Sequence, residues 1–378
     1  MSIVYIIIAA IALCYIILIG LYNISWYRLK LLKTSLYLPK TKVSIILPVR
    51  NEANHILTCL DKMCQQQYPA SLFEIIVVDD SSSDNTMALV NSFIKEHLQI
   101  KITVLELKLL NLSSKKQAIH EAIKITEGDL IITTDADCIM SEKWIGSIVA
   151  LYEKEKPAMI VGPVCFYNEK NIFQKWQSLE FLSLIASGAA SIRLGFPIMC
   201  NGANLAYEKK MYLNVGGFEE NKNYSSGDDV FLMHQIKKKL NGKIVFLKSN
   251  NALVYTKAQD TLNAFINQRK RWVSKTKGYS NWFTIFVAIL IFLYNFLLLA
   301  GFLGSFTNVL FLKITVLLFL FKCIIDFPLL WGITSFTRKK ELMLFYLPLQ
   351  IIYPVYIVFT SLLGSFAKFE WKGRIIKK

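Results

Sequence analysis

The segment DLIITTDADC, residues 129–138, decides how this chain is expected to fold. Its apolar run, followed by Thr133 and Thr134, is typical of a buried strand, and the strand ends in two acids, Asp135 and Asp137. Open α/β sheets bind ligands at the carboxyl ends of their strands, so this acid pair predicts a ligand site. A turn is the alternative interpretation, because aspartate also favours turns and helix starts.

Three further segments have the same design and extend the predicted sheet. VSIILPVRNEANHI (43–56) reads as a strand that stops at Pro48, followed by a loop and a helix through about residue 66. FEIIVVDDSSSDNT (73–86) and KITVLEL (101–107) add two strands, and a helical pattern over about 114–126 follows them. Strands that alternate with helices and are continuously apolar predict an α/β fold with a mostly parallel sheet covered on both faces.

Polar groups follow successive strands of this sheet. They are Asn51 and Glu52, then Asp79, Asp80 and Asp84, then Asp135 and Asp137. Acids that converge at one sheet edge repel one another unless a cation shares the space. Mg²⁺ or Mn²⁺ prefers oxygen ligands and is often held by one or two carboxylates together with substrate phosphates, so the last two acids predict a metal bridge to a diphosphate. Neither GxxxxGK[ST] nor GxGxxG occurs, which weakens ATPase and dehydrogenase interpretations.

The composition indicates a membrane protein. Hydrophobic residues make up 54% of the 378 residues and the mean hydropathy is +0.40. Residues 3–22 are uncharged, long enough to span a bilayer and without a cleavage site, and three more apolar runs cover 283–303, about 306–333 and 344–366. The predicted organisation is an N-terminal anchor (1–25), a catalytic domain (40–255), an interfacial amphipathic segment (256–281), C-terminal transmembrane segments (282–368) and a basic tail (369–378).

The positive-inside rule places residues 26–280 on the cytoplasmic side, because Arg28, Lys30 and Lys33 follow the first apolar run. The same rule places the loop TRKK (337–340) there. Four full crossings would leave the C-terminus outside, whereas its lysines and arginine favour the cytoplasm. One segment is therefore expected to be re-entrant or interfacial, and 344–366, which contains two prolines, is the first candidate.

Other charges and the cysteines exclude some alternatives. The net charge of +16 is spread along the chain without a nucleic-acid-binding signature, which fits anionic lipid better than nucleic acid. The seven cysteines show no metal-binding spacing. Inside the third apolar run, Lys322 and Asp326 are spaced to pair on one helix face; packing or snorkelling of Lys313 and Lys322 is the expected explanation of these charges.

The ordered set LPVRNE, VVDDSSSD, DAD, GDD and QRKRW resembles family 2 glycosyltransferases of the GT-A fold, a group that includes ceramide glucosyltransferase and the cellulose and hyaluronan synthases. The resemblance covers roughly residues 40–280. It implies that Asp80, with Glu52 and Asp84 nearby, contacts the base of a nucleotide, usually uridine, and that Asp135 faces the ribose or diphosphate while Asp137 holds the metal. Lys115 matches the lysine of a Gly-Lys pair that touches the diphosphate, although Ser114 replaces the glycine.

The second half of the domain implies the acceptor side. CNGANLAYEKK (200–210), which contains Asn204, resembles the loop that shapes the sugar and acceptor pocket; plain scaffold is the equal alternative. In SSGDDVFLMHQI (225–236) Ser225 and Ser226 are expected to cap a helix with Asp228 and Asp229 in its first turn. The resemblance assigns the general base to Asp229, and an aspartate near apolar surroundings is expected to have a raised pKa.

QRKRW (268–272) supplies the remaining match. Gln268, Arg271 and Trp272 fit the family's Gln-x-x-Arg-Trp, in which arginine grips a diphosphate and tryptophan offers a flat wall to a sugar ring or acceptor. A basic segment lying on anionic lipid is the other interpretation, and the two are compatible.

The resulting expectation is an inverting, Mg²⁺- or Mn²⁺-dependent glycosyltransferase in the cell membrane. It would move a sugar from a nucleotide-sugar, most simply a UDP-sugar, to a lipid or lipid-linked acceptor at the cytoplasmic face. A processive polysaccharide synthase is the first alternative; its channel would need a partner subunit or a homo-oligomer, because the C-terminal segments are few. A nucleotide-binding membrane scaffold or transporter subunit is the alternative from another class.

Overall fold

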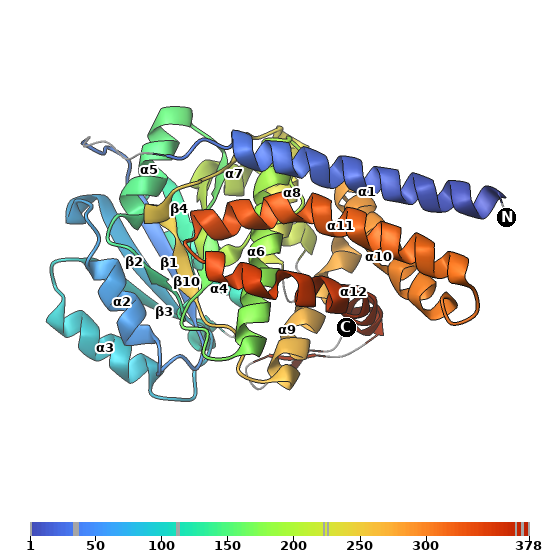
Figure 1. Cartoon of the computed structure of the whole chain (residues 1–378). Coiled ribbons are helices and arrows are strands. Elements are labelled where there is room, and N and C mark those ends of the chain that lie inside the picture. The colour runs from blue at the N-terminus through green and yellow to red at the C-terminus, as the bar shows by residue number, and fades with distance from the viewer. Residues whose placement is uncertain are drawn as a thin grey trace.

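The computed structural model of the chain describes residues 2–32, 38–110, 114–221, 224, 227–366, 369–371 and 374–376. Figure 1 shows an α/β domain beside a group of long helices, three of which, α1, α10 and α11, extend together away from the sheet. The molecule therefore combines an α/β domain with a group of apolar helices.

The described residues form one seven-stranded sheet at the centre of the α/β domain. The order of its strands is β3 (Lys101–Glu106), β2 (Phe73–Asp79), β1 (Val43–Val49), β4 (Leu130–Thr133), β8 (Leu205–Glu208), β6 (Met159–Val161) and β9 (Ile244–Phe246). β1 runs parallel to both β2 and β4, and β2 runs parallel to β3. β8 is antiparallel to β4 and to β6, so the sheet is mostly parallel with one reversed strand.

Two layers of helices cover the sheet because its central strands are apolar on both faces. One face packs against α2 (Ile56–Cys64), α3 (Thr86–Glu96) and α5 (Trp144–Glu155). The other packs against α4 (Lys115–Ile125), α6 (Ile172–Arg193), α7 (Lys209–Asn214) and α8 (Asp228–Leu240). Neighbouring residues show the alternation: Ile45 is buried in the first layer and Ile46 in the second. The predicted α/β architecture is confirmed.

The boundary predicted at Pro48 is wrong by one residue. β1 continues to Val49, and its register with β2 places Pro48 opposite Val78. The ladder between β1 and β4 ends at Ile46, so a proline two residues later removes no hydrogen bond from it.

A smaller sheet adjoins the carboxyl edge of the large one. It consists of β5 (Ile139–Met140), β10 (Val254–Thr256) and β7 (Val164–Phe166). After β10, helix α9 (Leu262–Ser274) carries the QRKRW motif and packs against α12 (Tyr346–Phe366). The motif helix therefore lies between the α/β domain and the apolar helices.

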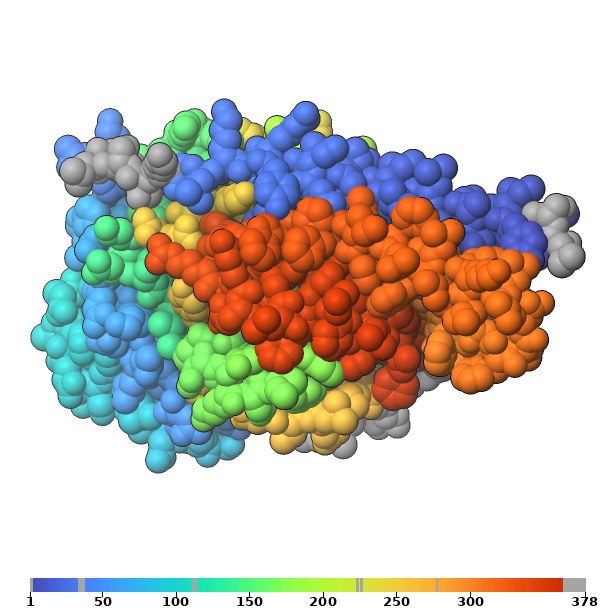
Figure 2. Space-filling view, viewed as in Figure 1, coloured from blue at the N-terminus to red at the C-terminus, as the bar shows by residue number. Residues whose placement is uncertain are grey.

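Three helical stretches of the described chain are long and apolar enough to cross a membrane by length and composition: residues 3–28, 282–304 and 340–362. The first two coincide with α1 (Ser2–Arg28) and α10 (Trp282–Gly304), and the third covers the 3-10 turn Lys340–Phe345 and most of α12. α11 (Val309–Phe336) packs against α1 and α10. Large apolar side chains are exposed along all four helices, and Figure 2 shows α11 and α12 forming one broad surface beside α1.

Two of the charges inside α11, Lys322 and Asp326, form a buried polar cluster, whereas Lys313 is exposed. Lys322 is 1% exposed, and its Nζ lies 2.6 Å from Asp326 Oδ2, which confirms the predicted pairing. Asp326 also accepts hydrogen bonds from Tyr15 of α1 (2.7 Å) and Gln350 of α12 (3.1 Å). Snorkelling is therefore the wrong explanation for Lys322, because its ammonium points into the bundle.

Candidate active site

A cavity of about 500 Å³ opens at the carboxyl ends of β1, β2 and β4, where the sequence predicted a ligand site. Most of the predicted site residues line it: Glu52, Asp80, Lys115, Asp135, Asp137, Asp228, Asp229, Gln268, Arg271 and Trp272. The cavity has the size of a ligand pocket, and charged side chains converge on it from the sheet, α4, α8 and α9.

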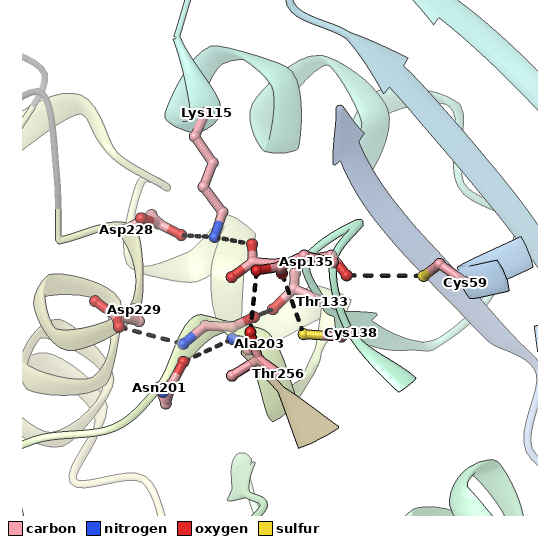
Figure 3. Close-up of polar contacts among 12 residues, drawn as sticks. Cys59, Lys115, Thr133, Asp135, Cys138, Asn201, Ala203, Asp228, Asp229 and Thr256 are labelled. Carbon is pink, nitrogen blue, oxygen red and sulfur yellow. Dashed lines mark hydrogen bonds and ion pairs between the residues drawn. The ribbon is translucent and has the colours of Figure 1, made fainter. Parts of the chain in front are cut away.

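The acid pair stands just beyond β4, which ends at Thr133. Asp135 Oδ1 lies 2.6 Å from Lys115 Nζ, and Asp137 Oδ2 accepts a hydrogen bond of 3.0 Å from the hydroxyl of Thr256 on β10. Figure 3 shows Lys115 reaching down from α4 between Asp228 and Asp135. The segment DLIITTDADC therefore combines both interpretations: β4 ends at Thr133, and a turn at Ala136 and Asp137, closed by a hydrogen bond from Cys138 N–H to the Asp135 carbonyl (3.1 Å), follows it. Both carboxylates line the cavity.

Lys115 is positioned by the start of α4. Ser114 is the N-cap, and its hydroxyl accepts a hydrogen bond from the backbone N–H of Gln117. Lys115 Nζ lies 3.6 Å from Asp228 Oδ2 as well as near Asp135. Burial alone would lower the pKa of this ammonium, but the two carboxylates outweigh it and raise the pKa. Lys115 therefore stays charged and is suited to an anionic ligand.

Asp229 is fixed by both of its carboxylate oxygens. Oδ1 accepts a hydrogen bond from the backbone N–H of Val230 (2.7 Å) and lies 3.4 Å from Lys275 Nζ, while Oδ2 accepts one from Gly202 N–H (3.2 Å). Burial would raise the pKa of Asp229, but these partners lower it. The expected raised pKa is wrong, because a cation and backbone donors surround a carboxylate that the sequence suggested lay in apolar surroundings.

The predicted serine cap of α8 falls on Ser225 and Ser226, which lie outside the described residues. The N-cap residue of α8 is Gly227, with φ of +89°. A Cβ on Gly227 would approach the Phe231 ring to 2.8 Å. This position therefore favours glycine both because its φ is positive and because a side chain would have no room. Asp228 and Asp229 nevertheless occupy the first turn, as predicted.

The motif on α9 forms the opposite wall of the cavity. Gln268, Arg271 and Trp272 line it, and the Trp272 ring lies 6.0 Å from the Phe181 ring of α6. Burial lowers the pKa of Arg271, whereas the four nearby carboxylates, Asp135 first among them, raise it. The cavity is thus lined by carboxylates (Asp135 and Asp137), by cations (Lys115 and Arg271) and by the aromatic ring of Trp272.

The nucleotide-side acids differ in their placement. Asp80 and Glu52 line the cavity, and Glu52 Oε2 lies 3.2 Å from His55 Nδ1. Asp84 does not line it: its carboxylate accepts hydrogen bonds from the backbone N–H groups of Ala53 (3.1 Å) and Thr86 (3.0 Å). In this position Asp84 holds the loop after β1 against the start of α3.

Asn204 likewise lies outside the cavity lining. It is 1% exposed; its carbonyl oxygen accepts from Trp144 Nε1 (3.0 Å), and its amide donates to the carbonyls of Pro163 and Ala252 (2.8 Å each). The structure therefore favours the scaffold interpretation of Asn204. Its neighbours Asn201, Gly202 and Ala203 reach the cavity instead.

Several lining residues were not proposed as site residues from the sequence. Arg50 follows β1 and donates to the backbone carbonyls of Asp80 and Ser81. Lys257 and Gln259 come from the segment between β10 and α9, and Asn267 lies in α9 just before the motif. Lys275 stands three residues after QRKRW among several lysines, so no spacing singles it out. Of these residues, Arg50 lies inside a motif, LPVRNE, and Asn267 directly precedes one.

Asp135 and Asp137 are the residues that fit a divalent metal. Among the described residues no group of three or more His, Cys, Asp or Glu side chains could hold a metal ion. Mg²⁺ and Mn²⁺ are commonly bound by one or two carboxylates together with substrate phosphates. The carboxylates of Asp135 and Asp137 are oxygen donors of the kind that such a metal accepts, and Lys115 and Arg271 line the same cavity as cations suited to a diphosphate.

Comparison with known proteins identifies the family of these motifs. The profile of a family described as "Glycosyl transferase family group 2" matches residues 130–360, and that of "Glycosyl transferase family 2" matches residues 44–214. The beta-monoglucosyldiacylglycerol synthase of Trichormus variabilis is 25% identical over 235 residues, which cover 61% of this chain and 48% of that protein. The probable glycosyltransferase YdaM of Bacillus subtilis is 26% identical over 234 residues, or 61% of this chain and 54% of that protein.

Among solved structures, the mannosyltransferase PcManGT of Pyrobaculum calidifontis, described in complex with GDP-Man and Mn²⁺, has a TM-score of 0.58. Identity is 14%, and the match covers 96% of this chain and 97% of that one, so the shared property is the fold. The chain spans about half the length of these curated relatives.

Proposed function

Because this chain belongs to glycosyl transferase family 2, with the GT-A fold, we propose that it is an inverting, metal-dependent enzyme that transfers a sugar from a nucleotide-sugar to a lipid or lipid-linked acceptor at a membrane face. A UDP-sugar is the first donor to test. The observation that carries the proposal is the cavity itself, which the Asp229 carboxylate lines together with the cations Lys115 and Arg271 and the acid pair that follows β4.

The donor side of the cavity suits a nucleoside diphosphate. Asp80 and Glu52 stand where the base would bind, and Lys115 and Arg271 would bind the diphosphate. Asp135 and Asp137 would hold Mg²⁺ or Mn²⁺, which when bound neutralises charge on the leaving diphosphate. The solved mannosyltransferase of similar fold is described with GDP-Man and Mn²⁺, which makes Mn²⁺ the first metal to test and GDP-Man a donor to include.

The base is proposed to be Asp229. In inverting transfer the acceptor oxygen forms its bond to the anomeric carbon as the bond to the diphosphate oxygen breaks, and the hydroxyl proton passes to a base. The lowered pKa of Asp229 keeps it ionised and able to accept that proton. Gly202 N–H and Lys275 hold its two oxygens, so the carboxylate is oriented before the acceptor arrives.

A lipid or lipid-linked acceptor fits the surroundings of the cavity. Its Trp272 side belongs to α9, and α9 packs directly on α12 in the apolar part of the molecule. One relative is described as a synthase of a glucosyldiacylglycerol, which is a lipid product. An acceptor embedded in the membrane therefore has a short route to Asp229.

The proposed orientation is cytoplasmic. Lys339, in the TRKK loop, forms an ion pair of 2.7 Å with Glu169 of the α/β domain, and Asn250 donates to the carbonyl of Phe336 (2.7 Å). This loop therefore lies on the same side of the membrane as the cavity. Basic loops favour the cytoplasmic side, so the cavity is proposed to face the cytoplasm.

The test is release of nucleotide by the detergent-solubilised full chain with Mn²⁺ or Mg²⁺, given a panel of UDP-sugars and GDP-Man with a membrane lipid extract. Lipid-stimulated release should be lost in Asp229→Asn and Asp137→Ala. Loss of one general base removes about 10²- to 10⁴-fold of rate, while nucleotide binding should survive in Asp229→Asn. The matched control is Asp61→Asn, which changes an acid of α2 that does not line the cavity.

The outcomes separate the alternatives. A labelled product extended by one sugar would support single addition to a lipid. A series of products of increasing length would instead favour a processive polysaccharide synthase. Release that is unaffected by Asp229→Asn would remove the proposed base. Nucleotide binding without turnover of any donor would favour a nucleotide-binding scaffold.

A further inference from the structure

Arg269, the second residue of QRKRW, is buried, although it does not line the cavity. It is 3% exposed, and residues of three helices engage its guanidinium. Nη2 forms an ion pair with Glu180 of α6, and Nε donates to the hydroxyl of Tyr356 on α12 (2.8 Å). The Tyr356 hydroxyl in turn donates to the other Glu180 oxygen (3.1 Å), which closes a ring of three groups.

The remaining face of the guanidinium is turned to two residues of the cavity. Nη1 donates to the side-chain oxygen of Gln268 (2.8 Å), and the guanidinium carbon lies 4.2 Å from the centre of the Trp272 ring. Gln268 and Trp272 both line the cavity. Arg269 thus links Glu180 and Tyr356 to this wall, and the Phe265 ring of α9 also lies 4.4 Å from its guanidinium carbon.

The chemistry of arginine explains how one side chain can bond to Glu180 and Tyr356 and also contact the cavity wall. The planar guanidinium donates several hydrogen bonds in fixed directions and can stack on an aromatic ring at the same time. A buried guanidinium also has to keep its carboxylate partner, because an unpaired buried charge is strongly destabilising. The orientation of Arg269 is therefore set by α6 and α12, and it in turn restricts the rotamers of Gln268 and Trp272.

We propose that Arg269 is a positioning residue for the transfer reaction: locked by Glu180 and by Tyr356 of the apolar helix α12, it holds Gln268 and Trp272 in the geometry that the acceptor and the diphosphate require. This rests on the proposed function. It makes α12 part of the machinery that shapes the cavity, although α12 contributes no lining residue.

The decisive variant is Tyr356→Phe, which removes one hydroxyl and keeps the ring. Its matched control is Tyr346→Phe on the same helix, where the lost hydroxyl donates to the carbonyl of Cys323 (2.6 Å) away from the cavity. Tyr356→Phe should lower kcat for transfer by about tenfold, as expected for a hydrogen bond to a charged group, with the donor KM changed less than about twofold. Tyr346→Phe should leave both values unchanged.

A second readout does not depend on turnover. For each variant, the fluorescence of Trp272 is obtained by subtracting the spectrum of the same variant that also carries Trp272→Phe. The quenching of this difference signal by acrylamide is then measured. Tyr356→Phe and Arg269→Lys, which keeps the charge and loses the fork, should increase the quenching of Trp272. Tyr346→Phe should not.

A fall in kcat and a rise in quenching confined to Tyr356→Phe and Arg269→Lys would support the proposal. Equal effects in Tyr346→Phe, or unchanged kcat and quenching in Tyr356→Phe, would overturn it, because the ring of three groups would then be only a structural support. If the unaltered enzyme turns over no donor, the proposed function fails, and the quenching of Trp272 still decides whether Arg269 positions this wall.

Discussion

Lys115 Nζ lies 2.6 Å from Asp135 Oδ1 and 3.6 Å from Asp228 Oδ2, so one ammonium joins the end of β4 to the first turn of α8. The acid pair and the proposed base come from segments far apart in the chain, and α4 brings them to one place. A diphosphate that enters the cavity would meet this ammonium between the two carboxylates.

Replacement of Lys115 by methionine should weaken nucleotide binding by about 10- to 100-fold, because a charge-assisted interaction with a buried group is lost. Titration with UDP, followed by displacement of a fluorescent nucleotide, measures it. Lys124→Met is the matched control on the same helix: Lys124 is about half exposed and pairs with Glu121. Similar affinities in the two variants would exclude Lys115 from the donor site.

Lys275 should set the acid limb of the pH–rate profile. Its ammonium, 3.4 Å from Asp229, lowers the pKa of that carboxyl, so Lys275→Met should raise the pKa. Because the base acts only when ionised, the rate would then fall away at a higher pH than in the unaltered enzyme. Lys270→Met removes a charge from the same region without touching the Asp229 ion pair and serves as the control. An unmoved acid limb would mean that another group titrates there.

His234 should make the fold sensitive to mild acid. Burial lowers its pKa from 6.5 to about 4, and its Nε2 lies 3.3 Å from the Thr284 hydroxyl at the start of α10. Between these two values the unfolded chain binds a proton that the folded chain does not, so stability falls as pH drops from about 6.5 towards 4. The loss is at most about 3 kcal/mol.

Thermal unfolding in detergent at a series of pH values measures this effect, and His234→Gln should flatten the part of the curve between pH 6.5 and 4. His97→Gln is the control, since His97 ends α3 far from α10. A curve of the same slope in His234→Gln would assign the sensitivity to other groups.

The C-terminus should lie on the same side of the membrane as the cavity. α12 follows the stretch Lys340–Phe345, beside the α/β domain, and the strand after it, β11 (Phe369–Trp371), contacts α9. Both ends of α12 therefore lie near that domain, which favours the interfacial or re-entrant arrangement over a full crossing, although the apolar length of residues 340–362 would suffice for one.

A topology reporter fused after Lys378 measures this orientation, and the same reporter inserted at Thr307, between α10 and α11, should report the opposite side. Equal signals from Thr307 and the C-terminus would show that α12 crosses the membrane completely.

The strands and the cavity follow from local patterns in the sequence. Continuous apolar runs ending in Glu52, Asp80 and Asp135 predicted a parallel sheet with acids at one edge, and the cavity lies there. Short-range patterns could not show that β8 inserts antiparallel between β4 and β6, since a four-residue strand has no directional signal.

Two predicted site residues do not line the cavity, for a different reason. Asp84 and Asn204 belong to matching motifs, yet Asp84 bonds to the backbone of Ala53, in the loop after β1, and of Thr86, and Asn204 bonds to three buried partners. Motifs assign a residue to a region, whereas the direction of a side chain depends on partners distant in sequence. The same reasoning explains why Lys275, and with it the lowered pKa of Asp229, could not be predicted.

The cluster around Lys322 has a consequence for how the protein is made. Tyr15, which donates to Asp326, stands 311 residues before it, and Gln350 is synthesised later still. The carboxylate in α11 therefore gains its further hydrogen bonds from a helix made earlier, α1, and from one made later, α12. Biogenesis must keep α1 laterally available until Gln350 has been synthesised, so α1, α11 and α12 complete their packing together.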